Sequence, residues 1–421
     1  MFKLINADDL DLTAYIRPGD TVTWGQATAE PLALIGKLLD QRADIGQVRA
    51  FVGMSIANMF RPEHADFIKF ISYGAVGTNT PLAAAGALEL IPCHFSAVPH
   101  LIDSGRLPID AVFVQLSPPG PDGTHSLGFS NDFLKIAMQR ARVVIGEINP
   151  HVPWSRLDAP LDESLIDFAI ESDIAPAAPD TPAPSPAEVQ IAKTIAGVVP
   201  DGATLQYGIG SLPAAVLAAL SGHRDLGLHS GLITDEAVDL VEAGAITNAR
   251  KPIHTGVSVS AVGCGSDKLK TFLHDNPAVE MHPSTTTHGA ATLAQLTNLV
   301  SINSALEVDL YGQVNAEQVG RRYVGAIGGQ VDYMHAAATA PGGLAIIAMP
   351  AQLGDTGRSR ITDTLGGPFV TTARTDVDLV VTEHGIADLR GKTLDERAAA
   401  LIGIAMLEHQ DRLVAAWREH S

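Results

Sequence analysis

Cysteine, aromatic side chains and positive charge are all scarce in this chain of 421 residues. Its two cysteines, Cys93 and Cys264, lie far apart and form no C-x-x-C pair, which argues against a disulfide scaffold and a cysteine-rich zinc site. With 47 acidic and 28 basic residues the formal net charge is −19. Nucleic-acid binding needs clustered Lys and Arg, so the composition argues against a nucleic-acid partner.

The sequence also lacks a long apolar run. A long uncharged stretch, "HAAATAPGGLAIIAMPAQLG", is interrupted by Pro341, Pro350 and a Gly-Gly pair, so it cannot form one spanning helix. The opening "MFKLINADDLDLTAY" breaks its apolar residues with acids and shows no targeting signal. We expect a cytoplasmic protein without a membrane partner.

Histidine is the residue type that could suggest a metal, because the chain holds 15 of them. The closest grouping, His282 and His288 in "MHPSTTTHGA", lies on a Pro/Thr-rich segment without helical spacing. Ordinary loop and surface imidazoles are the favoured interpretation, and we expect no metal site.

A proline-rich segment divides the chain. "SDIAPAAPDTPAPSPAEV", residues 172–189, carries proline at nearly every third position, which blocks helix and sheet and gives an extended connector. We expect an N-terminal domain over 1–173, a linker over 174–188 and a C-terminal domain over 189–421.

The two halves open in the same way. "RPGDTVTWGQATAEPLALIGKLLDQ" and "VPDGATLQYGIGSLPAAVLAALSGH" both read as a turn, a short apolar strand, a small-residue turn, and a proline at the first position of an amphipathic helix. Further strands are indicated by "DAVFVQLSPP", "ARVVIGEINP" and "DLVVTEHG". The pattern predicts a duplicated α/β domain, each copy with a largely parallel sheet.

The turn in the second half is a candidate ligand site. A strand over 204–207 leads into "GIGSL", residues 208–212, and glycines before a helix let a ligand approach free backbone N–H groups. A tight turn without a ligand explains this segment equally well. The dinucleotide fingerprint is incomplete, because a third glycine is absent and His229 and Ser230 stand where a ribose-binding acid is expected.

A second cluster of polar residues lies within residues 301–333. It holds Asn303, Ser304, Glu307, Asp309, Gln313 and Asn315. The pair Gly328–Gly329 follows and could present two N–H groups to a developing oxyanion. For Glu307 and Asp309 taken singly, exposure on an alternating strand is the favoured alternative.

Several long motifs together resemble the acetyl-CoA hydrolase/transferase family, relatives of the 4-hydroxybutyrate and acetate CoA-transferases. In the second half these are "GIGSLPAAV", "SINSALEVDLYGQVN", "GAIGGQVDY" and "GGPFVTTARTDVDLVVTEHGIADLRGKTLDERAAALI". In the first half "LSPPGPDGTHSLGFSNDF" resembles the family's SPPD-x-x-G-x-x-SLG-x-S-x-D segment. The likeness covers nearly the whole chain.

The resemblance implies two similar domains of the NagB/RpiA/CoA-transferase type and coenzyme A as part of the substrate. It also implies assembly as a homodimer or larger homo-oligomer. The positions that it assigns to CoA binding are Gly208, Ile209, Gly210, Ser211, Leu212, Leu306, Gly325 and Gly329. Acyl-CoA and a small carboxylic acid are the expected partners.

One position departs from the family. Its members carry a glutamate after the His-Ser or Tyr-Thr pair, and that carboxylate attacks the acyl-CoA thioester to form first an anhydride and then a glutamyl-CoA thioester. In this chain the position is Gly231, which has no nucleophile.

Three readings of this departure stay open. Another carboxylate could serve, with Glu307, Glu30 and Glu236 as candidates in that order, because Leu306 beside Glu307 matches a CoA-contacting position. Water could attack instead, which would make the protein an acyl-CoA hydrolase. The chain could also bind CoA esters without catalysis. A CoA-transferase is the favoured reading.

The sequence leaves the acyl group open. Arg321 and Arg322 could meet the second carboxylate of a dicarboxylic substrate, although a solvated surface pair is the favoured alternative.

Overall fold

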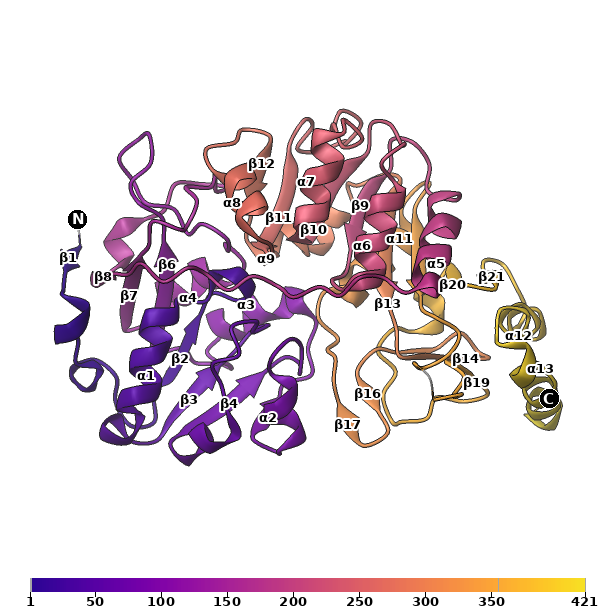
Figure 1. Ribbon diagram of the computed structural model, residues 1–421, viewed down its shortest axis with the longest axis horizontal. Helices are drawn as coiled ribbons and strands as arrows, with labels where there is room; N and C mark the ends of the chain where they lie inside the picture. Colours follow the sequence, from indigo (N-terminus) through magenta and orange to yellow (C-terminus); the bar gives the residue numbers. More distant parts are fainter. Residues whose placement is uncertain (1, 355, 421) are drawn as a thin grey trace. The chain divides into compact units, whose positions relative to one another are not determined.

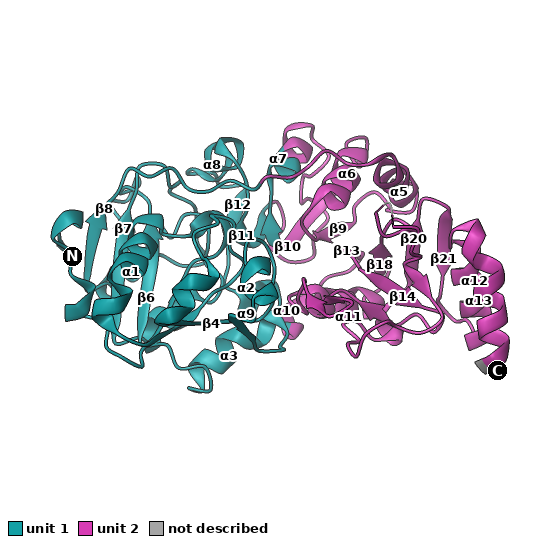
Figure 2. Ribbon diagram, turned by 60° about the horizontal axis from the view of Figure 1, so that its bottom comes forward, with its two compact units in different colours: residues 1–179, 231–238, 257–289 teal, residues 180–230, 239–256, 290–421 magenta. Residues whose placement is uncertain are grey.

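The computed structural model describes residues 2–354 and 356–420, and the chain forms two compact units. Unit 1 comprises residues 1–179, 231–238 and 257–289, drawn in teal in Figure 2. Unit 2 comprises residues 180–230, 239–256 and 290–421, drawn in magenta. The chain enters unit 2 within the proline-rich segment and returns to unit 1 for two short stretches.

Unit 1 contains an eight-stranded sheet with the order β1-β8-β7-β6-β2-β3-β4-β5 (Figure 1). Its strands are β1 (Lys3–Leu4), β2 (Thr21–Trp24), β3 (Val48–Phe51), β4 (Ile68–Ser72), β5 (Leu88–Leu90), β6 (Ala111–Leu116), β7 (Val143–Ile148) and β8 (Phe168–Glu171). Every neighbouring pair is parallel. The strands β2 and β6 are buried along their whole length, as expected for a parallel sheet that is covered on both faces.

The helices of unit 1 connect these parallel strands. They are α1 (Leu32–Ile45), α2 (Thr80–Ala84), α3 (Val98–Asp103) and α4 (Leu134–Arg140). Helix α1 buries Leu34, Ile35 and Leu38 on one face and ends at Gly46, whose φ of 87° suits glycine. The stretches that return to unit 1 add the parallel pair β11 (Ser258–Gly263) and β12 (Val279–Met281), with α8 (Asp267–Leu273) and α9 (Ser284–Thr287).

Unit 2 contains a second sheet with the order β10-β9-β13-β18-β20-β21. Its strands are β9 (Thr204–Tyr207), β10 (Gly227–Ile233), β13 (Leu299–Ser304), β18 (Leu344–Ala348), β20 (Leu379–Thr382) and β21 (Gly385–Asp388). All neighbours are parallel except β20 and β21. The chain passes from unit 2 to unit 1 at Gly231, inside β10.

Short strands and helices complete unit 2. The strands are β14 (Glu307–Asp309), β15 (Val314–Asn315), β16 (Gln318–Val319), β17 (Arg322–Tyr323) and β19 (Ile361–Thr362). The helices are α5 (Pro186–Ala196), α6 (Ser211–Ala219), α7 (Asp235–Glu242, divided between the units), α10 (Ala290–Leu293), α11 (Gln330–Thr339), α12 (Leu394–Gly403) and α13 (Leu407–His420). Strand β14 pairs with β15 and β19, which forms a small sheet beside the main one.

The predicted α/β class with mostly parallel sheets is confirmed. In each half a strand leads through a turn into a helix, β2 to α1 and β9 to α6. The predicted place of proline was wrong in both halves: helix α1 begins at Leu32 with Pro31 as its N-cap, and helix α6 begins at Ser211, so Pro213 is its third residue. Residues 172–185 carry neither helix nor strand, and α5 begins at Pro186.

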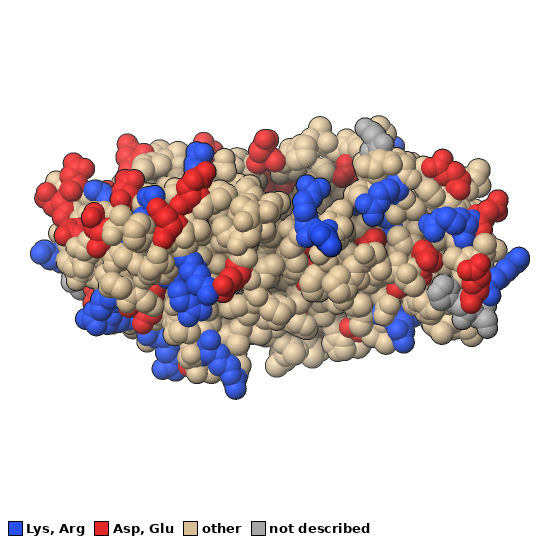
Figure 3. Space-filling model, turned by 90° about the horizontal axis from the view of Figure 1, so that it is seen from below, with Lys and Arg blue, Asp and Glu red and all other residues tan. Residues whose placement is uncertain are grey.

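The surface carries charged side chains of both signs (Figure 3). Figure 3 shows Lys and Arg together with Asp and Glu on one face, with a large uncharged area between them. Among the described residues, no helix has both the length and the apolar character needed to cross a bilayer.

Candidate active site

The glycine turn of unit 2 leaves the first turn of α6 open. Gly208 N donates to Ile302 O (3.1 Å), which continues the pairing of β9 with β13. Gly210 precedes the helix with φ 110° and ψ −179°, a conformation that is essentially restricted to glycine. Since glycine has no side chain to cap the helix, N–H groups of the first turn are available to an anionic ligand. Ile209 projects outward and is 40% exposed.

A buried cluster of polar side chains on β9 and β13 lies next to this turn. Gln206 on β9 accepts hydrogen bonds at Oε1 from Ser301 Oγ (2.5 Å) and Asn303 Nδ2 (3.0 Å), both on β13. A Cβ placed on Gly208 would lie 3.7 Å from Asn303 Oδ1. These hydrogen bonds therefore link the ends of β9 and β13, and the glycine turn follows directly after β9. Asn303 was expected among the polar residues of the site, whereas Gln206 was not.

Glu188 and Arg360 extend the site at the start of α6. Ser211 Oγ donates to Glu188 Oε1 (2.6 Å), and Glu188 also closes the capping box of α5 with Ser185. Burial acts to raise the pKa of Glu188, but the hydrogen bonds from Ser211 and Ser185, with the charge of Arg360, hold it below its ordinary value. Burial lowers the pKa of Arg360, and the negative charges of Glu188 and Glu383 act in the opposite direction. Glu188 thus contacts the predicted turn directly and interacts electrostatically with Arg360.

Arg360 connects the turn to the second predicted cluster. Its Nη1 donates to Ala305 O (3.2 Å), and its backbone carbonyl accepts from Val308 N (2.8 Å). Ala305 directly precedes Leu306 and Glu307. The glycine turn is thus linked to the backbone that carries two predicted site residues by two hydrogen bonds, Ser211 to Glu188 and Arg360 to Ala305, and by the electrostatic interaction between Glu188 and Arg360.

Glu307 begins β14 and is half-buried. Within the described residues, both hydrogen bonds to its carboxylate reach Oε1, from Asn315 Nδ2 (3.0 Å) and Gly366 N (2.8 Å). Leu306 N donates to Asn315 O (2.8 Å). The side chain is therefore held by one oxygen, and Oε2 is left to other contacts.

The predicted glycines of this cluster have different structural settings. A Cβ on Gly325 would collide with the carbonyl oxygen of Ala316, so packing alone requires glycine there. Gly328 has φ 53°, in the left-handed region, and Gly329 is the N-cap of α11. The Gly-Gly pair thus precedes a second helix N-terminus in unit 2, which fits the predicted donation of N–H groups.

Gly231 lies in unit 1, and the His288 side chain fills the space that a side chain at 231 would occupy. A Cβ at this position would lie 2.7 Å from both Cε1 and Nε2 of His288. His288 is buried, and burial lowers the pKa of its imidazole to about 3. No local sequence pattern indicates this contact, because the two residues are far apart along the chain.

The other candidate carboxylates also belong to unit 1. Glu30 is 1% exposed, and its Oε2 accepts from Ile56 N (2.9 Å) and Ala57 N (3.0 Å). Burial raises its pKa, which the hydrogen bonds from Ser55 and these amides oppose. Glu236 lies in the first turn of α7. Glu307 is thus the one candidate of the three that belongs to the same unit as the glycine turn.

The remaining polar candidates are placed as follows. His282 faces Glu280 (Nε2 to Oε2, 2.9 Å), whereas His288 Nδ1 lies 2.9 Å from Thr287 Oγ1. The two imidazoles therefore have different partners. Arg321 and Arg322 are exposed, at the turn between β16 and β17.

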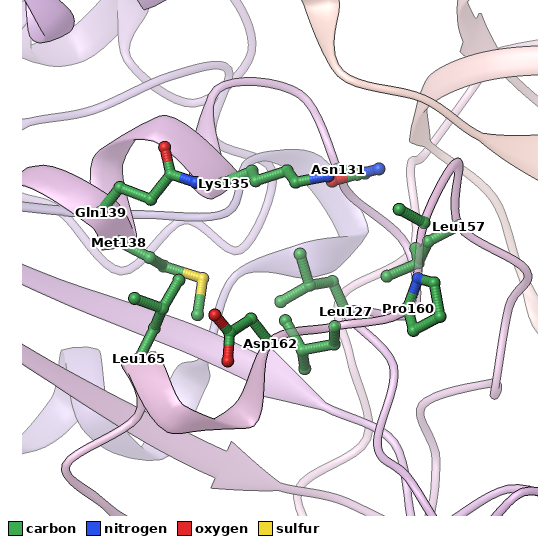
Figure 4. A pocket seen from close by; sticks show the side chains of 11 residues that line it. Leu127, Asn131, Lys135, Met138, Gln139, Leu157, Pro160, Asp162 and Leu165 are labelled. Atoms are coloured by element: carbon green, nitrogen blue, oxygen red, sulfur yellow. The ribbon is translucent and has the colours of Figure 1, made fainter.

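A cavity in unit 1 contains none of the predicted site residues (Figure 4). Its lining is mainly apolar and includes Leu127, Met138, Leu157, Pro160 and Leu165. Its polar residues are engaged: Asn131 Nδ2 donates to Asp158 Oδ1 (2.8 Å), and Lys135 Nζ lies 3.5 Å from Asp158 Oδ2. The cavity adds no reactive group to the candidates.

Fold and site together define an α/β protein that offers a helix N-terminus to an anionic ligand. The chain belongs to the acetyl-CoA hydrolase/transferase family, whose N-terminal domain matches residues 3–176 and whose C-terminal domain matches residues 265–417. This confirms the family that the motifs indicated.

Individual relatives share nearly the whole chain. It is 35% identical to the 4-hydroxybutyrate coenzyme A transferase of Clostridium kluyveri, over 99% of this chain and 97% of that protein. The crystal structure of RipA from Yersinia pestis superposes with a TM-score of 0.93 at 31% identity, over 99% and 97% of the two chains. The 4-hydroxybutyrate CoA-transferase of Porphyromonas gingivalis gives a TM-score of 0.83 at 32% identity, over 100% and 98%.

Proposed function

We propose that this protein is a CoA-transferase that moves CoA between a small acyl-CoA and a carboxylic acid. The observation that carries the proposal is the open N-terminus of α6 after Gly208–Gly210, in a chain whose full-length relatives are named CoA-transferases. Acetyl-CoA hydrolases also match, but one from Eremothecium gossypii is 28% identical over only 47% of this chain. Transfer is therefore favoured over hydrolysis.

CoA would bind to residues of both clusters. The proposed contacts are Gly208, Ile209, Gly210, Ser211 and Leu212 at the turn, with Leu306, Gly325 and Gly329. Backbone N–H groups at a helix N-terminus favour negative charge, and glycine allows close approach. The Glu188–Arg360 pair holds Ser211 and Ala305 in place from the protein side.

Glu307 is the proposed nucleophile, since position 231 supplies none. The hydrogen bonds from Asn315 and Gly366 anchor Oε1, so Oε2 is the oxygen that would attack the thioester carbonyl. The attack forms an acyl–glutamyl anhydride and releases CoA thiolate. The thiolate then attacks the glutamyl carbonyl, which gives a glutamyl-CoA thioester and frees the first acid.

The second half of the reaction reverses these steps. The acceptor carboxylate attacks the glutamyl thioester, CoA thiolate leaves, and it attacks the acceptor carbonyl of the new anhydride. Glu307 is regenerated as a carboxylate, and the acceptor departs as its CoA ester. Backbone N–H groups at Gly329 and the start of α11 would stabilise the oxyanions of these additions.

The test is incubation with acetyl-, propionyl- and succinyl-CoA, with and without a panel of carboxylic acids. The proposal predicts a new acyl-CoA that appears only when an acceptor acid is added, without release of free thiol. Thiol release without an acceptor would identify a hydrolase. Binding of CoA esters without exchange or thiol release would identify a non-catalytic binding protein.

We also propose a metal requirement, a location and an oligomeric state for the protein. The chemistry needs no metal ion, so activity should survive a chelator. We place the protein in the cytoplasm and propose a homodimer or larger homo-oligomer, which light scattering after size-exclusion chromatography would measure.

A further inference from the structure

The end of β10 is filled by a side chain from elsewhere in unit 1. A Cβ on Gly231 would lie 2.7 Å from two ring atoms of His288, Cε1 and Nε2. Ordinary van der Waals contacts between carbon atoms are about 3.5–4.0 Å. Even the smallest side chain at 231 therefore requires the imidazole to move.

The imidazole is held from several directions. Its Nδ1 lies 2.9 Å from Thr287 Oγ1, and the Phe95 ring packs edge-on with a centroid distance of 5.0 Å. The backbone on both sides is also fixed, because His288 N donates to Ser284 O (2.9 Å) and a Cβ on Gly289 would collide with the carbonyl oxygen of Thr285. Burial keeps the pKa of the ring low, so it is neutral and offers no ready ion pair to a carboxylate.

We propose that His288 is a steric block at the end of β10: its imidazole takes the volume that any side chain at position 231 would need, so this chain carries its nucleophile elsewhere. Positions 231 and 288 are then coupled: residue 231 stays glycine because the His288 imidazole fills the space that a side chain there would need. The catalytic part of this inference rests on the proposed transferase function, whereas the steric part does not.

A double-mutant cycle tests the steric part without using activity. Gly231→Ala should lower Tm by several degrees in the natural chain, since overpacking a filled site is destabilising. In the His288→Ala background the same change should cost much less, because the ring is gone. An equal loss of Tm in both backgrounds would overturn the block.

Trapping of the intermediate tests the catalytic part. Borohydride reduces a glutamyl-CoA thioester to the alcohol and releases CoA, so the trapped adduct is a reduced glutamate side chain. After incubation with acetyl-CoA and then borohydride, Gly231→Glu alone should give no such adduct at residue 231. Gly231→Glu combined with His288→Ala should give it on the peptide containing residue 231. An adduct at 231 in the single variant, none there in the double variant, or an acyl group on His288 would overturn the inference.

The two proposals fail in different ways. If the natural chain shows no exchange with any acid while the Tm cycle shows coupling, the transferase proposal fails and the steric block stands. If exchange is normal and the Tm losses are equal, the block fails and the transferase stands.

Discussion

The two strand–turn–helix modules differ in what they place at the helix N-terminus. In unit 1 the first turn of α1 is occupied from within: Leu34 N donates to Oε2 of the buried Glu147 (3.1 Å). In unit 2 the first turn of α6 follows Gly210, and the hydroxyl of Ser211 turns away to Glu188. Unit 1 thus supplies a carboxyl group of its own to the first turn of α1, whereas unit 2 leaves the first turn of α6 open.

This difference shows how a repeated module acquires separate roles. A helix N-terminus attracts negative charge whether that charge belongs to the protein or to a ligand. In unit 1 the carboxyl group of the buried Glu147 already accepts a hydrogen bond from the first turn of α1, so this contact belongs to the fold and not to a ligand. In unit 2 the first turn of α6 remains for the substrate, so the same geometry serves binding.

The largest effect on activity is expected at Glu307 of unit 2, and the buried Glu147 of unit 1 serves as the comparison. Glu307→Gln should reduce exchange by at least about a thousandfold, because an amide cannot form the anhydride. The matched control, Glu147→Gln in unit 1, should leave kcat and KM unchanged. Steady-state assays with acetyl-CoA and an acceptor acid measure both, and similar losses in the two variants would erase the proposed distinction.

A large effect on stability is expected at Glu147. Burial raises its pKa to about 7 from a model-peptide value of 4.5, against the hydrogen bonds from Leu34, Ser172 and Ala33. Since the folded pKa is the higher one, its stabilising contribution is complete below pH 4.5 and is lost as the pH rises through 7.

This contribution amounts to roughly 3 kcal/mol, from the size of the shift. The unfolding free energy should therefore fall from pH 4.5 to above pH 7, and Glu147→Gln should remove that part of the fall. Urea titrations at several pH values measure it. A fall of the same size in the variant would show that Glu147 is not its source.

A smaller effect is expected at the open turn. Gly208→Ala places a methyl at ordinary distances from protein atoms, 3.7 Å from Asn303 Oδ1 and 3.9 Å from Pro213 Cγ. The fold should therefore accept it, while CoA esters that approach the backbone should bind about tenfold more weakly, a loss of about 1.4 kcal/mol. Calorimetry with CoA measures this. Gly222→Ala, with no atom within 4 Å of the added methyl, is the control, and unchanged affinity in both would remove the turn from the site.

The smallest effect is expected at the start of α11. Gly329→Ala keeps the N–H group but restricts its approach to the substrate, so turnover should fall a few-fold and more than affinity does. Measurement of kcat and of the Kd for CoA, in the variant and in the natural chain, separates the effect on turnover from the effect on affinity. Weaker binding at unchanged turnover would contradict the oxyanion role.

Local patterns predicted much of the fold. The apolar runs that became β6, β7 and β20 and the strand–turn–helix over β9 and α6 were visible because each depends on residues close in sequence. The start of α6 was missed by two residues, since proline is also tolerated within a first helical turn. The family followed from long motifs that agree in order.

The site was predictable only in part. Gly208–Leu212 could be named because glycine before a helix has a local meaning. The position of Arg360 at Ala305 and that of His288 beside Gly231 could not be predicted, because each brings together residues that are distant in the sequence. Packing of this kind depends on tertiary structure, which no spacing rule encodes.

The central claim is that Glu307 carries CoA during the reaction, and trapping tests it most directly. The protein is incubated with acetyl-CoA, reduced with borohydride or cleaved with hydroxylamine, and the modified peptide is located by mass spectrometry. The account predicts a modification on the peptide containing Glu307, absent from Glu307→Gln. Exchange that proceeds with no adduct, or with the adduct on Glu30 or Glu236, would contradict it.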